Sequence, residues 1–161
     1  MGVQLSLGNF DPSLAIGKRL ISLDPGSADS RAWFALALLA HGRPQECSSM
    51  VKDAMRLNPR YPLWYQNLLA RALDVAGKPQ ESLEVSKGIL ARQHDRFSVV
   101  LVRTGILARE GLEQEAKEAM TDLRRINPNF RLAHVKGFFM SRDQDYVAAF
   151  TEALRKAALP E

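Results

Sequence analysis

Apolar residues recur along most of the chain at the three- to four-residue spacing that marks one face of a helix. Two segments show this spacing clearly, with apolar positions at Cys47, Met50, Val51, Ala54 and Leu57, and at Leu112, Ala116, Ala119, Met120, Leu123 and Ile126. This spacing predicts amphipathic helices. No segment shows the sustained alternation of apolar and polar residues that indicates a strand. The sequence therefore predicts an all-helical protein.

Glycine and proline divide the helical segments at a regular interval. Four glycines are spaced by 34, 35 and 34 residues: Gly8, Gly42, Gly77 and Gly111. Seventeen residues after each glycine come three prolines and one histidine: Pro25, Pro59, His94 and Pro128. Glycine readily takes the left-handed conformation that closes a helix, and proline suits the first turn of the next helix, as at Pro44 and Pro79. The pattern predicts a repeated helix, turn, helix, turn unit.

A helix pair of this size cannot bury its apolar face alone, so successive pairs must stack around a shared core. At this period the residues resemble the tetratricopeptide repeat (TPR). In the first complete unit the signature falls on Phe34, Ala35, Leu38, Gly42, Cys47, Val51, Ala54 and Pro59. In the second it falls on Leu69, Ala70, Leu73, Gly77, Ser82, Ser86 and Ile89, with His94 replacing the closing proline. In the third it falls on Thr104, Leu107, Gly111, Ala116, Met120, Leu123 and Pro128, with Arg103 at a usually apolar site.

The TPR resemblance implies an all-α, right-handed superhelical solenoid of antiparallel helix pairs that forms one domain over residues 1–161. We expect a partial repeat over 3–26, full repeats over 27–61, 62–96 and 97–129, and a capping helix pair over 130–161. Within the cap we expect helices over 130–140 and 146–158. The chain starts in mid-repeat, and we expect Met1 and Gly2 to stand in place of an upstream part of a longer protein. The exposed first helix then offers Leu14, Leu20 and Leu23 for self-association as a homodimer.

The same resemblance implies a binding surface for a protein or peptide on the concave side, lined by the first helix of each pair. The projected positions are Asp29, Ala32, Leu36, Leu39, Trp64, Asn67, Arg71, Asp74, Ser98, Leu101 and Arg109. Trp64 and Arg71 stand out because these residue types are enriched in binding hot spots, although packing of Trp64 between repeats is equally expected. The carboxylate clamp of chaperone-binding TPR proteins is absent, since its positions carry Ala32, Leu36, Leu68, Ser98 and Val102. We therefore predict an apolar or amphipathic partner.

Two stretches resemble the C-terminal TPR regions of bacterial class III adenylate or guanylate cyclases. One is the segment 56–62, and the other is the tail, at 127–130 and 154–161. Similar tails occur on bacterial transcriptional regulators, so both kinds of parent protein stay open. The cyclase catalytic domain itself is not among these residues. The resemblance implies a non-catalytic regulatory or oligomerising module of a bacterial signalling protein.

Composition and charge bear on the kind of partner. A hydrophobic fraction of 46% with 25% charged residues is typical of a folded globular protein. The net charge of +4 and the pI near 9.5 favour nucleic acid, which some helical-repeat proteins bind. However, the 22 basic residues are interspersed with 18 acidic ones, and the densest basic spot is only Arg124, Arg125 and Arg131. The charges therefore predict solvated helix faces and no nucleic-acid partner.

Residues able to carry catalysis or metal binding are scattered. The three histidines, His41, His94 and His134, lie 53 and 40 residues apart, without the i, i+4 spacing of a helical metal site. The lone Cys47 falls on a helix face, where a small buried hydrophobe is expected and not a nucleophile. We predict no metal, no cofactor and no small-molecule substrate.

An enzyme site hidden in the groove is suggested only by Asp74 and Arg109, which belong to no catalytic constellation. Glycine-rich phosphate loops are also missing. We therefore predict that the chain is not an enzyme. A single cysteine, no leader-like N-terminus and no run of eighteen apolar residues predict a cytoplasmic protein that does not enter the membrane.

Overall fold

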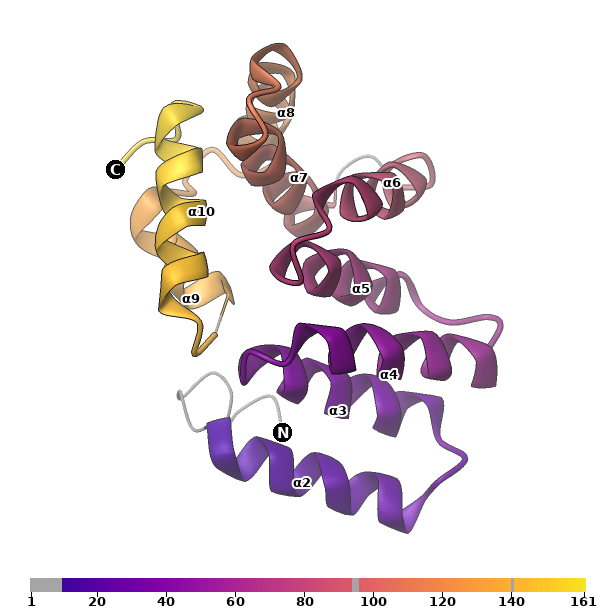
Figure 1. Cartoon of the computed structure of the whole chain (residues 1–161). Helices are drawn as coiled ribbons and strands as arrows, with labels where there is room; N and C mark the ends of the chain where they lie inside the picture. Colours follow the sequence, from indigo (N-terminus) through magenta and orange to yellow (C-terminus); the bar gives the residue numbers. More distant parts are fainter. Residues whose placement is uncertain (1–9, 94–95, 140) are drawn as a thin grey trace.

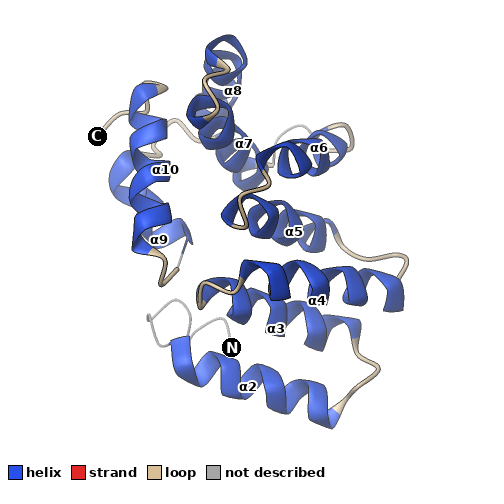
Figure 2. Cartoon of the chain, in the orientation of Figure 1, coloured by secondary structure: helices blue, strands red, loops and turns tan. Residues whose placement is uncertain are grey.

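The computed structural model describes residues 10–93, 96–139 and 141–161, and this part of the chain is helical, with no strand (Figure 2). The α-helices are α2 (Phe10–Leu23), α3 (Ala28–Ala40), α4 (Pro44–Leu57), α5 (Leu63–Val75), α6 (Pro79–Leu90), α7 (Phe97–Arg109), α8 (Glu113–Ile126), α9 (Val135–Phe139) and α10 (Gln144–Lys156). A short 3-10 helix, η1 (Leu132–His134), precedes α9. The predicted all-helical class is confirmed.

Helices α2 to α8 stack in sequence order along a curved path (Figure 1). The most extensive packing joins the two members of each pair: α3 with α4, α5 with α6, and α7 with α8. The pairs are linked where α4 packs on α5 and α6 packs on α7. Helices α3, α5 and α7 thus form the inner layer of a TPR-type solenoid, which is the fold that the repeat pattern predicts.

Three glycines close the first helix of each pair by the mechanism that their spacing predicts. Gly42, Gly77 and Gly111 have φ angles of +73°, +75° and +75°. The residue after each glycine donates its backbone N–H to a carbonyl in the last turn, as Lys78 does to Leu73 at 2.9 Å. A residue with a Cβ atom would be strained in this left-handed conformation, whereas glycine adopts it without strain. Gly8, the first glycine of the series, lies outside the described residues, as does His94.

The C-terminal cap departs from the helix pair predicted for it. Instead of one helix over 130–140, the chain forms η1 and the five-residue α9. The second helix, α10, begins at Gln144, and Asp143 caps it by accepting a hydrogen bond from the Tyr146 backbone N–H at 2.9 Å. The tail then turns back, since the Leu132 N–H donates to the Pro160 carbonyl at 2.8 Å.

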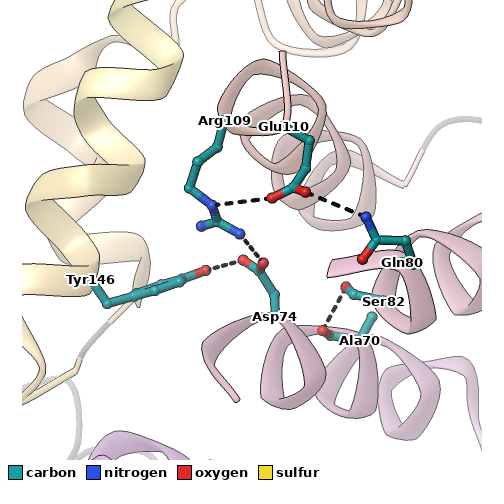
Figure 3. Close-up of polar contacts among 7 residues, drawn as sticks. All are labelled: Ala70, Asp74, Gln80, Ser82, Arg109, Glu110 and Tyr146. Carbon is teal, nitrogen blue, oxygen red and sulfur yellow. Dashed lines mark hydrogen bonds and ion pairs between the residues drawn. The ribbon is translucent and has the colours of Figure 1, made fainter. Parts of the chain in front are cut away.

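The core falls into two main clusters of buried side chains. One is centred on α3, α4 and α5, and the other joins α7 and α8 to the cap. Cys47 is fully buried in the first cluster, and burial raises the pKa of its thiol to about 12. The thiol is therefore a packing group, as its position on the helix face predicts. In the second repeat, the buried Ser82 hydroxyl donates to the Ala70 carbonyl at 2.7 Å (Figure 3).

Helix α10 packs on α7, the inner helix of the third pair. The contact is closest at Gly105, where a Cβ atom would lie 2.2 Å from Cζ of the buried Phe150 ring. Gly105 therefore leaves the space that the ring fills. It corresponds in the repeat to Leu36 and Arg71, which lie 69 and 34 residues earlier.

Replacing Gly105 by alanine is expected to lower the free energy of unfolding by about 1–3 kcal/mol, because the new methyl group overpacks the site against Phe150. The matched control is Gly88→Ala, at an exposed site in α6 with no neighbour within 4 Å. It should raise stability by about 0.5–1 kcal/mol through helix propensity. Urea unfolding followed by circular dichroism measures both, and equal effects of the two substitutions would contradict the packing of α10 on α7.

Candidate partner-binding surface on the concave face

The C-terminal part of the inner face is covered by the chain's own cap. Asp74 of α5, with 3% of its surface exposed, forms an ion pair with Arg109 of α7. Tyr146 of α10 donates its hydroxyl to the second oxygen of the same carboxylate at 2.5 Å (Figure 3). Glu110 lies 4.0 Å from Arg109 and accepts a hydrogen bond from Gln80 at 3.3 Å. One buried carboxylate thus joins three helices.

The chemistry of this cluster is that of a structural junction. Burial and the neighbouring Asp74 carboxylate hold the pKa of Tyr146 well above its ordinary value, so the phenol keeps the proton that it donates. The Arg109 guanidinium lies 5.9 Å from the centre of the Tyr146 ring. Asp74 and Arg109, the two residues that suggested a hidden enzyme site, are therefore bound to each other and to Tyr146.

The cap also reaches the first helices of the chain. The Arg142 backbone N–H donates to the Ala40 carbonyl at 2.9 Å, at the end of α3. The Arg142 guanidinium forms an ion pair with Asp11 of α2 at 2.8 Å, and His41 lies 3.2 Å from the other oxygen of that carboxylate. Figure 1 shows the loop before α10 close to the ends of α2 and α3. The loop before α10 therefore contacts the N-terminal helices α2 and α3.

A pair of tryptophans lies on the N-terminal part of the face. Trp33 of α3 and Trp64 of α5 have ring centroids 5.2 Å apart, and Trp64 also meets the Tyr65 ring edge-on at 4.5 Å. Tyr65 is fully buried and donates its hydroxyl to the Asp29 carboxylate at 2.5 Å. Trp33 keeps 40% of its surface exposed. Trp64 therefore packs between repeats while its partner Trp33 faces solvent.

Two polar residues of α5, Asn67 and Arg71, lie between Trp64 and the cap. Asn67 donates from its side-chain amide to the Ser98 hydroxyl of α7 at 3.0 Å. Arg71 donates to the Phe139 carbonyl of α9 at 3.2 Å, with its guanidinium carbon 5.4 Å from the Phe138 ring and 5.6 Å from the Phe139 ring. Burial lowers the pKa of Arg71 from its ordinary value. Arg71 is thus held at the boundary between the open and the covered parts of the face.

Three residues projected onto the binding surface belong to the core. Ala32 and Leu101 are 0% exposed and Leu39 is 5% exposed: Ala32 and Leu39 belong to the first core cluster, and Leu101 belongs to the cluster that joins α7 and α8 to the cap. Leu36 is half-buried against the first cluster. These side chains offer a partner little or no contact area, which corrects the projected lining at Ala32, Leu39 and Leu101.

The residues that complete the face were not identified from the sequence. They are Trp33, Gly105, Phe138, Phe139, Tyr146 and Phe150. For Trp33 a signal was present, since it follows the projected position Ala32 and lies in the repeat before Trp64. For Gly105 the signal was a small residue at the repeat position of Leu36 and Arg71.

Within residues 10–93, 96–139 and 141–161, no three histidine, cysteine, aspartate or glutamate residues gather as metal ligands. His134 accepts a hydrogen bond from the Arg131 backbone N–H at 3.0 Å, in the first turn of η1. Among the helices placed by the structure, none is both long and apolar enough to cross a membrane.

Comparison with solved structures places the fold among TPR proteins. TTC0263, a thermophilic TPR protein in Thermus thermophilus, superposes with a TM-score of 0.70 and 22% identity over 97% of this chain and 88% of that one. MamA (41-end) from Desulfovibrio magneticus RS-1 gives 0.68 and 15%, over 97% and 88%. YrrB, described as a TPR protein with an unusual peptide-binding site, gives 0.62 and 17%, over 97% and 80%. Neither a protein-family model nor a curated protein matches the sequence. At these identities the likeness shows the fold.

Removal of the Asp74 carboxylate is expected to destabilise the protein by about 3 kcal/mol, since Asp74→Ala leaves the Arg109 guanidinium and the Tyr146 hydroxyl without their partner. Tyr146→Phe should cost about 1.5–3 kcal/mol, the range of a hydrogen bond to a charged group. The control is Asp53→Ala, which removes an exposed ion pair with Arg56 and should change stability by no more than about 0.5 kcal/mol. Denaturant unfolding at pH 7 separates these values. Matching costs for Asp74→Ala and Asp53→Ala would contradict the junction.

Proposed function

We propose that the chain is a non-catalytic module that binds a protein or peptide segment on the N-terminal part of its concave face. The observation that carries the proposal is the Trp33–Trp64 pair, with Trp33 40% exposed beside the half-buried Trp64. Tryptophan contributes large contact area and is enriched among hot spots. A partner that packs an apolar side chain on this pair fits the amphipathic ligand predicted from the sequence.

The fold supports this proposal because the cap covers one part of the inner face and leaves the other part open. The cap covers the side chains of Asp74 and Arg109 and the backbone at Gly105, so the surface open to a partner is that of α3 and of α5 as far as Arg71. A TPR protein of similar fold, YrrB, is described as having a peptide-binding site. Two of the basic residues that raised the possibility of nucleic acid are engaged elsewhere: Arg124 donates to the Ala158 carbonyl and Arg131 to the Pro128 carbonyl.

Peptides selected from a random phage-displayed library against the full chain test this function. Affinity of a selected peptide is expected to fall at least about 10-fold for Trp33→Ala and for Trp64→Ala, as hot-spot residues predict. Leu112→Ala is the control, because Leu112 is also 40% exposed but lies at the start of α8, in another pair. Fluorescence anisotropy measures each affinity. Peptides that bind all three variants like the unsubstituted chain would reject the proposed surface.

We further propose that the module regulates or oligomerises a bacterial signalling protein in the cytoplasm, with a nucleotide cyclase as the favoured parent and a transcriptional regulator as the alternative. The support is the resemblance of residues 56–62 and of the tail. Phe130, Leu154 and Leu159 of that tail are buried in the cap, so their pattern also serves closure of the solenoid. A cyclase or winged-helix domain encoded directly upstream in the same reading frame identifies the parent.

Self-association remains a proposal for the N-terminal helix α2. Leu14 packs against the core of the first helix pair, which assigns it to the fold. Leu20 is half-buried, and Leu23 is 72% exposed. Gly17 and Ser13 are buried on the same helix, where α2 meets α3. Of the three leucines predicted for self-association, Leu20 and Leu23 are therefore the two available to a second copy of the chain.

A homodimer formed through α2 should dissociate when charge is placed on its apolar face. Light scattering is expected to give a dimer mass for the unsubstituted chain and a monomer mass for Leu23→Asp and Leu20→Asp, because an unpaired charge at an apolar contact costs desolvation energy. Leu57→Asp, which alters a 48% exposed leucine at the end of α4, should stay dimeric. A monomeric unsubstituted chain at every concentration would exclude this role for α2.

A further inference from the structure

Arg71 carries a positive charge on the inner face without a carboxylate to balance it in the part of the chain that the structure places. Of its five N–H donors, one on Nη2 reaches the Phe139 carbonyl at 3.2 Å. Its Nε is buried and has no acceptor. The other arginine projected onto this face, Arg109, has the Asp74 carboxylate as its partner. Because a desolvated charge is costly unless it is paired, Arg71 has unused capacity to bind an anion.

Aromatic rings hold this guanidinium in place. Phe138 and Phe139 lie 5.4 and 5.6 Å from its central carbon, and such contacts stabilise a cation while leaving its N–H donors free to bond in other directions. Arg71 keeps part of its surface exposed, so a ligand can approach it. A preorganised guanidinium loses less entropy when it binds a carboxylate than a mobile side chain does.

A second polar atom without a partner lies one helical turn away. Asn67 uses its amide N–H₂ on Ser98, whereas its Oδ1 is buried and accepts no hydrogen bond. Residues at i and i+4 of a helix share one face, which places this acceptor beside Arg71. Two unsatisfied groups of opposite kind lie on adjacent turns of the same face: a donor on Arg71, which suits a ligand carboxylate, and an acceptor on Asn67, which suits a backbone N–H of the same peptide and not its carboxylate.

The spacing along α5 sets the geometry of the ligand. Trp64, Asn67 and Arg71 stand at i, i+3 and i+7, so the tryptophan and the arginine are separated along the axis by roughly 10 Å. A peptide in the polyproline II conformation covers about 9 Å in three residues and returns to the same side. An apolar residue and a residue three positions away would therefore reach Trp64 and Arg71 together.

We infer that Arg71 is a binding site for a carboxylate of the partner peptide, three residues from an apolar side chain that packs on Trp33 and Trp64. This inference rests on the proposed function and names the chemical class of its ligand. A guanidinium pairs with a carboxylate through charge-assisted hydrogen bonds, which are stronger than neutral ones. The Asp29 carboxylate, bonded to Tyr65 near the tryptophan pair, disfavours an anionic group at that end of the ligand. The site thus takes an apolar residue at one end and an acidic one at the other.

The test uses peptides recovered from the phage selection, synthesised with their acidic residues intact and with each replaced by its amide isostere, Asn or Gln. Both C-terminal forms, free acid and amide, are made to separate a side-chain carboxylate from a terminal one. For the unsubstituted chain, loss of the carboxylate is expected to weaken binding about 10- to 100-fold. For Arg71→Met the two peptides should bind within about twofold of each other. Arg56→Met, on the outer helix α4 with 78% of its side chain exposed, should preserve the discrimination.

Because Arg71 also bonds to α9, Arg71→Met can loosen the cap, and a measurement on the unsubstituted chain removes that ambiguity. The ¹⁵N-resolved Nε–H resonance of Arg71 should shift with the acidic peptide and stay unchanged with its isostere. Equal binding of both peptides by the unsubstituted chain, together with an unmoved Nε–H resonance, would overturn the carboxylate site while leaving the tryptophan surface intact. If no selected peptide depends on Trp33 or Trp64, the proposed function fails and the carboxylate site fails with it.

Discussion

The close approach of the Phe150 ring to the backbone of Gly105 determines how this solenoid ends. A stack of helix pairs leaves an apolar surface on its last member, and that surface must be covered for the protein to stay soluble. Here the covering helix α10 lies on the inner helix α7, and this placement requires a residue without a side chain at Gly105. Once α10 occupies that position, Tyr146 comes within reach of Asp74 and α9 comes within reach of Arg71. As a result, the cap covers the C-terminal part of the inner face and leaves the N-terminal part open.

The repeating part of the fold was predictable because its causes are local. Gly42, Gly77 and Gly111 adopt left-handed conformations that their positions between helices require, and each is followed by the next helix within a few residues. Apolar spacing then fixes which side of each helix is buried. None of these steps needs knowledge of distant contacts. The same reasoning predicts that Cys47 is a packing residue, and its side chain is fully buried.

The cap and the composition of the inner face were less predictable, because they depend on contacts between residues far apart in the sequence. Projection of the repeat assigned Asp74, Arg71 and Arg109 to an open groove, whereas residues of the C-terminal cap contact all three. Projection also placed Ala32 and Leu101 on the surface, although both side chains are buried in the two core clusters. Repeat position specifies the direction of a side chain but not what lies in front of it.

The return of the cap to the first helices has a consequence for how the chain folds. Repeat proteins contact mainly their sequence neighbours, so their folding can begin at several places and spread outward. The bonds from Arg71 to Phe139 and from Tyr146 to Asp74 instead join residues 68 and 72 positions apart, and Arg142 reaches back to Ala40. Closing such long loops costs chain entropy before any contact is gained, which slows folding. The repeats can therefore form early, while the inner face takes its final shape only when α10 has been synthesised and docked.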